Sequence, residues 1–428
     1  MATQAPAQLE PLADQVQPRW NLPTRIAFRF NFIYFTLYVV FTQMFQGLLP
    51  FVRINISNLG VLPPVKAIVF WTSAKLFGVD TGKLVFSGSG SGDKTYDYVL
   101  AFCMLILAIV GTAVWSLAAR RAAQHPKLHK WFHLFLRFSL GSTMAVYGMM
   151  KLIPLQMPFP QLTRLVEPYG NFSPMGVLWY SIGASPAYES FVGSAELLGG
   201  ILLFFPRTAI LGAMICLADV VEVFMLNMCY DVPVKLFSFH LILMSLVLLA
   251  PEMPRLARFF FSDRELTARV RPDLFASPRK NRIAFWAQVV LAIAIVSNYV
   301  YNDYQSWYRY GAGSPKSPLY GIWNIEEPTQ WKRVIFDRPT GLSFQKLDDS
   351  FTTYPVALDS KSSTIAVSRA NDKTWGSLKF ERPTSDTLTI DGNLGTDKVH
   401  LRAKLLDRSK LLLVSRGFHW IQEYPFNR

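Results

Sequence analysis

The stretch TAILGAMICLADVVEVFMLNMCY, residues 208–230, decides how this chain folds. Its apolar and small residues continue for long enough to form a helix that crosses a bilayer, which takes ~20 residues. Asp219 and Glu222 nevertheless lie in the middle of it, one helical turn apart. Because an ionisable side chain inside a membrane is costly, such residues usually face the interior of a helix bundle or a water-filled cavity. The stretch therefore predicts a membrane helix with one polar face.

The composition of the whole chain is that of a membrane protein. Of its 428 residues, 51% are hydrophobic and only 17% are charged, whereas about 25% of the residues in soluble domains are charged. The net charge of +14 comes from Lys and Arg residues that are grouped between apolar segments, where the positive-inside rule places them. We therefore expect the lipid bilayer as a partner, and no nucleic acid.

Apolar runs predict about seven membrane spans. They cover residues 26–50, 98–118, 131–152, 188–205, 208–228, 235–250 and 283–301. The basic loops 119–130 and 251–282 should face the cytoplasm together with the N-terminus. With seven spans, the C-terminus then lies outside. The expected location is a bacterial inner membrane or plasma membrane.

The composition changes after the last predicted span. From about residue 318 the chain is polar, and short alternating runs such as TLTIDG are separated by turn residues such as DGNLGTD. This pattern predicts a small antiparallel β-domain, either a sandwich or a barrel, on the outer, periplasmic face. Such a domain could recruit an external protein partner. The expected fold class is an α-helical polytopic membrane bundle followed by a small all-β extramembrane domain.

Other ionisable residues lie in the neighbouring apolar segments. Glu196 lies between Gly193 and Gly199, and small residues at that spacing let two helices approach closely. His240 lies at a depth similar to that of Glu222 if each residue adds ~1.5 Å. We expect an outer-half polar cavity that brings such groups together. Its predicted members are Asp219, Glu222 and His240, which would handle protons as catalytic residues, and Tyr147, Lys151, Glu196, Asn227, Tyr230, Asp231 and Lys235, which would bind a ligand.

The chemistry of this set leaves two interpretations open. A buried carboxylate near a histidine can accept or relay a proton, and this suits a quinone headgroup, whose reduction takes up protons. The same groups could instead form only the hydrogen bonds and ion pairs that hold the bundle together. No metal site is expected, because no Glu-x-x-His pair lies within a span. His125, His129 and His133 have helical spacing, but Pro126 interrupts that helix, and a solvated helix end is favoured.

Several motifs resemble the DoxX-like family of integral membrane proteins. They are contained in RFSLGSTMAVYGMMKLIPLQMPFP (137–160), LVEPYGNFSPMGVLW (165–179), GASPAYESFVGSAELLGGILLFFPRTAILGAM (183–214) and NMCYDVPVKLFSFHLILM (227–244). The resemblance covers roughly residues 130–260 and implies a four-helix membrane core. It matches the family at Tyr147, Lys151, Glu196, Arg207, Asp231 and Lys235. Some relatives are associated with quinone-linked sulfur oxidation or oxidative stress and others look like assembly factors, so the resemblance implies no single reaction.

These observations predict a redox-associated membrane component that binds a quinone or a lipid-like molecule, and a quinone is the cofactor they suggest. The alternatives are a proton-coupled small-molecule transporter and a non-catalytic scaffold or assembly factor. The predicted domains are a cytoplasmic tail (1–25), two spans with an external loop (26–130), the DoxX-like four-helix core (131–262), a basic loop with the last span (263–317) and the external β-domain (318–428).

Overall fold

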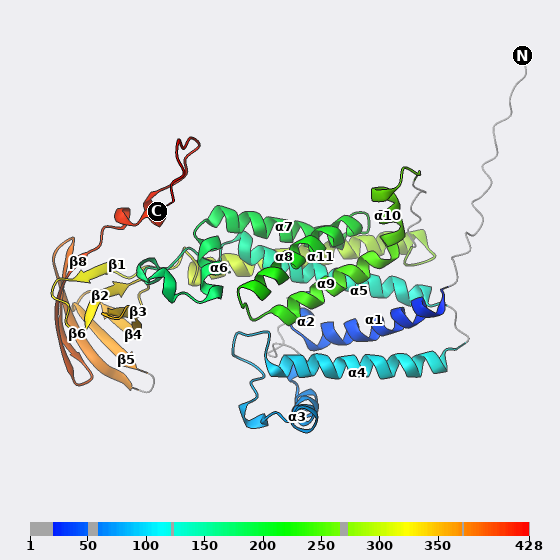
Figure 1. Cartoon of the computed structure of the whole chain (residues 1–428), viewed down its shortest axis with the longest axis horizontal. Coiled ribbons are helices and arrows are strands. Elements are labelled where there is room, and N and C mark those ends of the chain that lie inside the picture. Colours follow the sequence, from blue (N-terminus) through cyan, green and yellow to red (C-terminus); the bar gives the residue numbers. More distant parts are fainter. Residues whose placement is uncertain (1–19, 50–58, 121–123, 266–272, 370–371, 428) are drawn as a thin grey trace, which may run out of the picture. The chain divides into compact units, whose positions relative to one another are not determined.

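The computed structural model describes residues 20–49, 59–120, 124–265, 273–369 and 372–427. Most of the predicted cytoplasmic tail and parts of both predicted basic loops lie outside these ranges. The described residues form a set of apolar helices followed by an all-β barrel (Figure 1), which confirms the expected fold class.

The helices follow the apolar runs of the sequence. In chain order they are α1 (Leu22–Phe41), α2 (Met44–Leu48), α3 (Pro63–Phe77), α4 (Thr95–Ala118), α5 (Pro126–Leu152), α6 (Pro174–Gly183), α7 (Pro186–Phe204), α8 (Ala209–Cys229), α9 (Lys235–Leu249), α10 (Met253–Phe261), α11 (Pro278–Arg309) and α12 (Leu412–Ser415). Among the described residues, five helical segments are long and apolar enough to cross a membrane: α4, α7, α8, residues 235–261 and α11. The chain is thus an integral membrane protein.

The first predicted span differs from the structure. Residues 26–50 were expected to form one helix, but α1 ends at Phe41 and α2 begins at Met44. Thr42 lies between them in an extended conformation (φ −114°, ψ 179°). Its carbonyl accepts the Phe45 N–H at 3.3 Å and its hydroxyl accepts the Met44 N–H at 3.5 Å. Because threonine can satisfy the next backbone groups in this way, it starts a new turn and does not continue the helix.

The chain divides into two compact units. The first unit comprises residues 1–143, 200–220 and 234–295, and the second comprises residues 144–199, 221–233 and 296–428. In the first unit, two arginines bind backbone carbonyls near the ends of helices. Arg29 donates to Ala119 beyond α4 at 3.3 Å, and Arg137 donates to the Leu203 and Phe204 carbonyls of α7 at 2.8 and 2.9 Å. Cations are favourable there because the carbonyls at a helix C-terminus have no partner within the helix.

The second unit contains the barrel. Its strands are β1 (Gly321–Ile325), β2 (Trp331–Phe336), β3 (Gly341–Lys346), β4 (Phe351–Asp359), β5 (Thr364–Arg369), β6 (Asp372–Thr384), β7 (Thr387–Leu394) and β8 (Asp397–Leu405). Each strand pairs antiparallel with the next, and β1 closes the sheet against β8 with Trp323 opposite Leu405. Apolar side chains such as Trp323, Phe336 and Phe344 fill the interior, as is usual for small eight-stranded barrels.

A segment of the helical part packs on the outside of this barrel, within the second unit. Leu162, from the chain between α5 and α6, forms a buried cluster with Ile322 of β1 and Ile335 of β2. The Leu162 N–H donates to Asp337 at 3.2 Å, and Gln345 donates to the Val166 carbonyl at the same distance. The proline-rich loop after α5 therefore binds the barrel, within this unit, through both apolar contacts and hydrogen bonds.

Candidate functional site

A buried ion pair joins α5 to α7 in the second unit. The Lys151 ammonium lies 2.5 Å from the Glu196 carboxylate, and these residues are only 6% and 3% exposed. Gly148 and Gly193 make this contact possible, because the two helix backbones touch at these positions. A Cβ atom on Gly193 would lie 2.4 Å from the Leu152 nitrogen, and one on Gly148 would lie 2.6 Å from the Leu197 nitrogen.

A second buried carboxylate of α7, Glu189, was missed by the sequence analysis. We refer to Lys151, Glu189 and Glu196 together as the buried cluster. Glu189 is fully buried in the first turn of α7, and its Oε1 accepts the Met157 N–H at 2.8 Å. The Lys151 ammonium also acts on it electrostatically. Glu189 precedes Glu196 by seven residues, which is two helical turns, so both lie on the same face of α7. This spacing was the signal that could have identified it.

His240 forms a structural contact in the first unit. Its Nδ1 lies 2.7 Å from the Leu236 carbonyl, and its Nε2 lies 2.7 Å from the Tyr34 hydroxyl. A carbonyl can only accept, so Nδ1 carries a proton and donates to Leu236, and Nε2 and the Tyr34 hydroxyl share the second hydrogen bond. The ring also stacks on Tyr38, with centroids 3.9 Å apart and an interplanar angle of 6°. His240 is therefore held between α9 and α1 by its hydrogen bond to Tyr34 and by its stacked ring.

The two carboxylates of α8, Asp219 and Glu222, lie in different surroundings. Asp219 is half-buried on α8, whereas Glu222 is exposed on the same helix. Asn227 is buried, and Tyr147 and Tyr230 are half-buried.

Asp231 and Lys235 belong to the turn between α8 and α9. Asp231 has a φ of 53°, and the Val232 N–H bonds to the Asn227 carbonyl at 3.0 Å, which is the pattern of a helix C-cap. Asp93 accepts the Lys235 and Leu236 N–H groups at 2.9 Å each and so caps the start of α9. The predicted set is thus distributed over several local structures, within which Lys151 and Glu196 are in direct contact.

The histidine-rich end of α5 was expected to be solvated, and this expectation was wrong. Pro126 begins α5 and does not interrupt it, since proline is well suited to the first helical position. The His129 ring lies 4.3 Å from His133 and 5.4 Å from Trp20, so the segment is packed among aromatic side chains. Among the described residues, no group of three or more His, Cys, Asp or Glu side chains could hold a metal ion.

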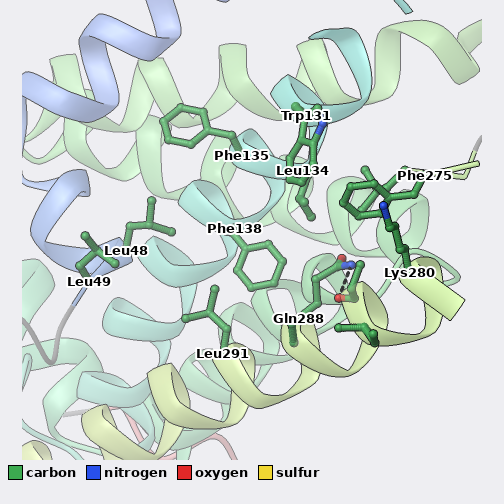
Figure 2. Close-up of a pocket in the computed structure, with 14 residues that line it drawn as sticks. Leu48, Leu49, Trp131, Leu134, Phe135, Phe138, Phe275, Lys280, Gln288 and Leu291 are labelled. Carbon is green, nitrogen blue, oxygen red and sulfur yellow. Dashed lines mark hydrogen bonds between the residues drawn. The ribbon is translucent and has the colours of Figure 1, made fainter. Parts of the chain in front are cut away.

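The first unit also contains an apolar pocket that the sequence analysis did not identify. It has a volume of about 570 Å³ and lies between α2, α5 and α11. Figure 2 shows Phe138 of α5 opposite Gln288 and Leu291 of α11, with Leu48 and Leu49 at one end. The complete lining is Leu48, Leu49, Trp131, Leu134, Phe135, Phe138, Leu274, Phe275, Lys280, Ile283, Ala284, Ala287, Gln288 and Leu291.

The polar groups of this pocket are few and unevenly placed. Lys280 and Trp131 lie together with Phe275 at the end away from Leu48 and Leu49 (Figure 2). Gln288 lies between the two ends and donates its Nε2 to the Ala284 carbonyl at 3.0 Å. Its Oε1 is buried and accepts no hydrogen bond from the described residues. The pocket therefore has an apolar end, a polar end and one free acceptor between them.

Comparison with known proteins gives one informative match. The chain is 35% identical over 129 residues to the uncharacterised protein YwoB of Bacillus subtilis (strain 168). The match covers 30% of this chain and 79% of that relative. No family model matches the chain, and no solved structure matches it.

Proposed function

We propose that this chain, which belongs to the family of the uncharacterised protein YwoB, binds a lipid-like amphiphile such as a quinone in the pocket between α5 and α11. The observation that carries the proposal is the pocket itself, whose volume of about 570 Å³ falls within the range of ~300–1,000 Å³ typical of small-molecule sites. Its lining is mostly apolar with a few polar groups, which is also typical of such sites.

The arrangement of polar groups supports one orientation of the bound molecule. An apolar tail would lie along Phe138 and Leu291 toward Leu48, and a polar head would lie near Lys280. Lys280 can donate to a carbonyl or phosphate oxygen, and Gln288 Oε1 can accept from a hydroxyl. Because lipid tails are as apolar as leucine, burial of the tail gives little selectivity inside a membrane. We therefore assign the selectivity to the shape of the pocket and to the contacts with the head.

A quinone satisfies these requirements in both of its redox states. The carbonyl of the oxidised form would accept from Lys280, and the hydroxyl of the reduced form would donate to Gln288. A bound quinone would make the chain a redox-associated membrane component in which the protein holds and orients the head. The buried groups Lys151, Glu189 and Glu196 lie in the second unit and have no part in this proposal.

A second candidate function, a membrane scaffold, is favoured by the barrel. Apolar side chains fill its interior, so the barrel offers its outer surface to other molecules. A barrel of this kind would recruit an external protein partner.

We further propose that residues 131–262 are related to the DoxX-like family, which the quoted motifs support. We also propose that the barrel lies outside the cell.

Filling the pocket tests the amphiphile proposal. Ala284 lines the pocket, whereas Val290 lies on the same helix, is 64% exposed and does not line it. Full-length wild-type protein, Ala284→Trp and Val290→Trp would be purified in mild detergent and examined by native mass spectrometry and absorption spectroscopy. We expect a bound lipid or quinone in the wild type and in Val290→Trp, and its loss in Ala284→Trp. Equal occupancy in all three proteins, or none in the wild type, would contradict the proposal, and the latter result favours the scaffold.

A further inference from the structure

A smaller pocket lies in the second unit, where the end of α11 meets the barrel. Its volume is about 230 Å³. Three parts of the chain line it. The loop after α5 provides residues 158–162, and the segment after α11 provides residues 310–312 and 314–316. The barrel side provides Tyr320, Asp337, Arg338 and Arg408. Because α11 is long and apolar enough to cross a membrane and ends at Arg309, this pocket begins where the chain leaves that helix.

Three cations line this pocket, against one carboxylate. The carboxylate, Asp337, already accepts the Leu162 N–H at 3.2 Å. Among the described residues, Lys316, Arg338 and Arg408 form no ion pair with an acid. Their contacts are instead neutral: Arg338 donates to the Tyr310 carbonyl at 2.7 Å, and Arg408 donates to the Tyr320 hydroxyl at 3.2 Å.

Two of these cations approach the same aromatic ring. The Lys316 ammonium lies 4.8 Å from the centroid of Tyr320, and the Arg408 guanidinium lies 5.7 Å from it. The Arg408 Nε is buried and has no acceptor among the described residues. Lys316 and Arg338 are exposed and Arg408 is half-buried, and like charges that converge repel each other unless an anion is present. The pocket therefore has both an excess of positive charge and an N–H donor without a partner.

We propose that this pocket binds a phosphate group, carried either by an anionic phospholipid headgroup or by a soluble phosphate compound. Arginine presents planar N–H donors that match the oxygens of a phosphate, and lysine adds a mobile point charge. At about 30 Å³ per water molecule, the pocket holds on the order of eight waters, which is room for a phosphate with a small substituent. This site is separate from the α5–α11 pocket and does not depend on the amphiphile proposal.

The test uses the full chain in lipid nanodiscs and has two arms. In the first arm, phosphatidylglycerol is added to phosphatidylcholine discs, and the bound phosphatidylglycerol is counted by native mass spectrometry. In the second arm, the discs contain phosphatidylcholine alone, and calorimetry measures the binding of inorganic phosphate as it is titrated in. The variants are Lys316→Gln and Arg408→Gln, with Arg408→Lys to retain the charge. The matched control is Arg402→Gln, which removes an exposed barrel arginine that pairs with Glu326 outside the pocket.

We expect binding in at least one arm. Arg408→Gln should weaken this binding about tenfold, since a charge-assisted hydrogen bond is lost. Binding should be partly restored in Arg408→Lys and unchanged in Arg402→Gln. Binding only in the first arm identifies a lipid headgroup, and binding only in the second identifies a soluble phosphate. Absence of binding in both arms, or equal weakening by Arg402→Gln, would overturn the proposal. Size-exclusion profiles show whether each variant is folded before its binding is compared.

Discussion

At the scale of single residues, Lys151 is the group on which the buried cluster depends. It neutralises Glu196 directly and acts on Glu189 as well. Removal of one partner of a buried ion pair usually costs about 3–5 kcal/mol, because the other charge is left without compensation. Lys151→Met leaves two buried carboxylates, whereas Glu196→Gln leaves the lysine with Glu189. We therefore expect Lys151→Met to lower the free energy of unfolding by about 3–5 kcal/mol and Glu196→Gln to lower it by less.

Unfolding in detergent, monitored by tryptophan fluorescence, measures the difference in free energy of unfolding between the two variants. Lys83→Met is the control, because Lys83 pairs with Asp80 at the surface and its side chain is 87% exposed; it should change stability little. The prediction depends on which of the two buried variants loses more free energy of unfolding. If Glu196→Gln proved as destabilising as Lys151→Met, Glu189 would not share the lysine.

His240 shows what sequence reasoning can and cannot supply for one residue. A histidine in an apolar run predicts a buried polar contact, and the residue is buried. Its partner, Tyr34, is 206 residues away in the chain, so no local pattern could indicate it. Glu189 was missed for a different reason: it follows Pro186 in the first turn of a helix, where a carboxylate usually stabilises the helix start and needs no other explanation.

At the scale of secondary-structure elements, the contact between α5 and α7 depends on two glycines. A Cβ atom on Gly193 would lie 2.6 Å from the Gly148 carbonyl oxygen, and backbone atoms cannot rotate away as a flexible side chain can. Gly193→Ala should therefore force the helices apart and destabilise the protein by about 1–3 kcal/mol.

Thermal unfolding of the purified protein checks this prediction. Gly170→Ala is the matched control in the same unit, since a Cβ atom there would have no neighbour within 4 Å. The melting temperature should fall for Gly193→Ala and stay constant for Gly170→Ala. A melting temperature unaffected by Gly193→Ala would show that the helices do not pack at this distance.

The helices themselves could be predicted well, and the barrel only in part. Apolar runs gave the positions of α4, α7, α8, α9 and α11 to within a few residues, except that α11 is longer than its predicted span at both ends. Alternating polar and apolar residues predicted strands but did not distinguish a sandwich from a barrel. The distinction depends on the pairing of β1 with β8, in which Ile325 lies opposite Ala403, and no local pattern encodes such a contact.

The α5–α11 pocket could not be predicted for a related reason. Its lining comes from three separate parts of the sequence, residues 48–49, 131–138 and 274–291. Each part looks like the lipid-facing side of an ordinary membrane segment. Among the polar residues that attracted attention in the sequence, His240 contacts Tyr34 and Asp231 lies in the turn after α8, and neither lines this pocket.

At the scale of the whole molecule, the orientation in the membrane is the first property to test. The proposed orientation has the barrel outside, and it rests on the positive-inside rule applied to the seven predicted spans. Cysteines would be introduced singly into a chain that lacks Cys103, Cys216 and Cys229. A cysteine at an exposed barrel position such as Asp348 should react with a membrane-impermeant maleimide in intact cells or spheroplasts. A cysteine at Lys127, in the predicted cytoplasmic loop, should react only after lysis. The opposite pattern of labelling would invert the proposed topology.

The central claim, that an amphiphile occupies the pocket between α5 and α11, is tested most directly by photo-crosslinking. Full-length protein in nanodiscs would be irradiated with a lipid or quinone analogue that carries a photoreactive tail, and the modified peptides would be mapped by mass spectrometry. We expect crosslinks concentrated at Phe138, Leu291 and their neighbours in the pocket, and we expect these crosslinks to be lost in Ala284→Trp. Crosslinks spread evenly over exposed apolar positions such as Val290 and Ile293, unaffected by Ala284→Trp, would contradict it.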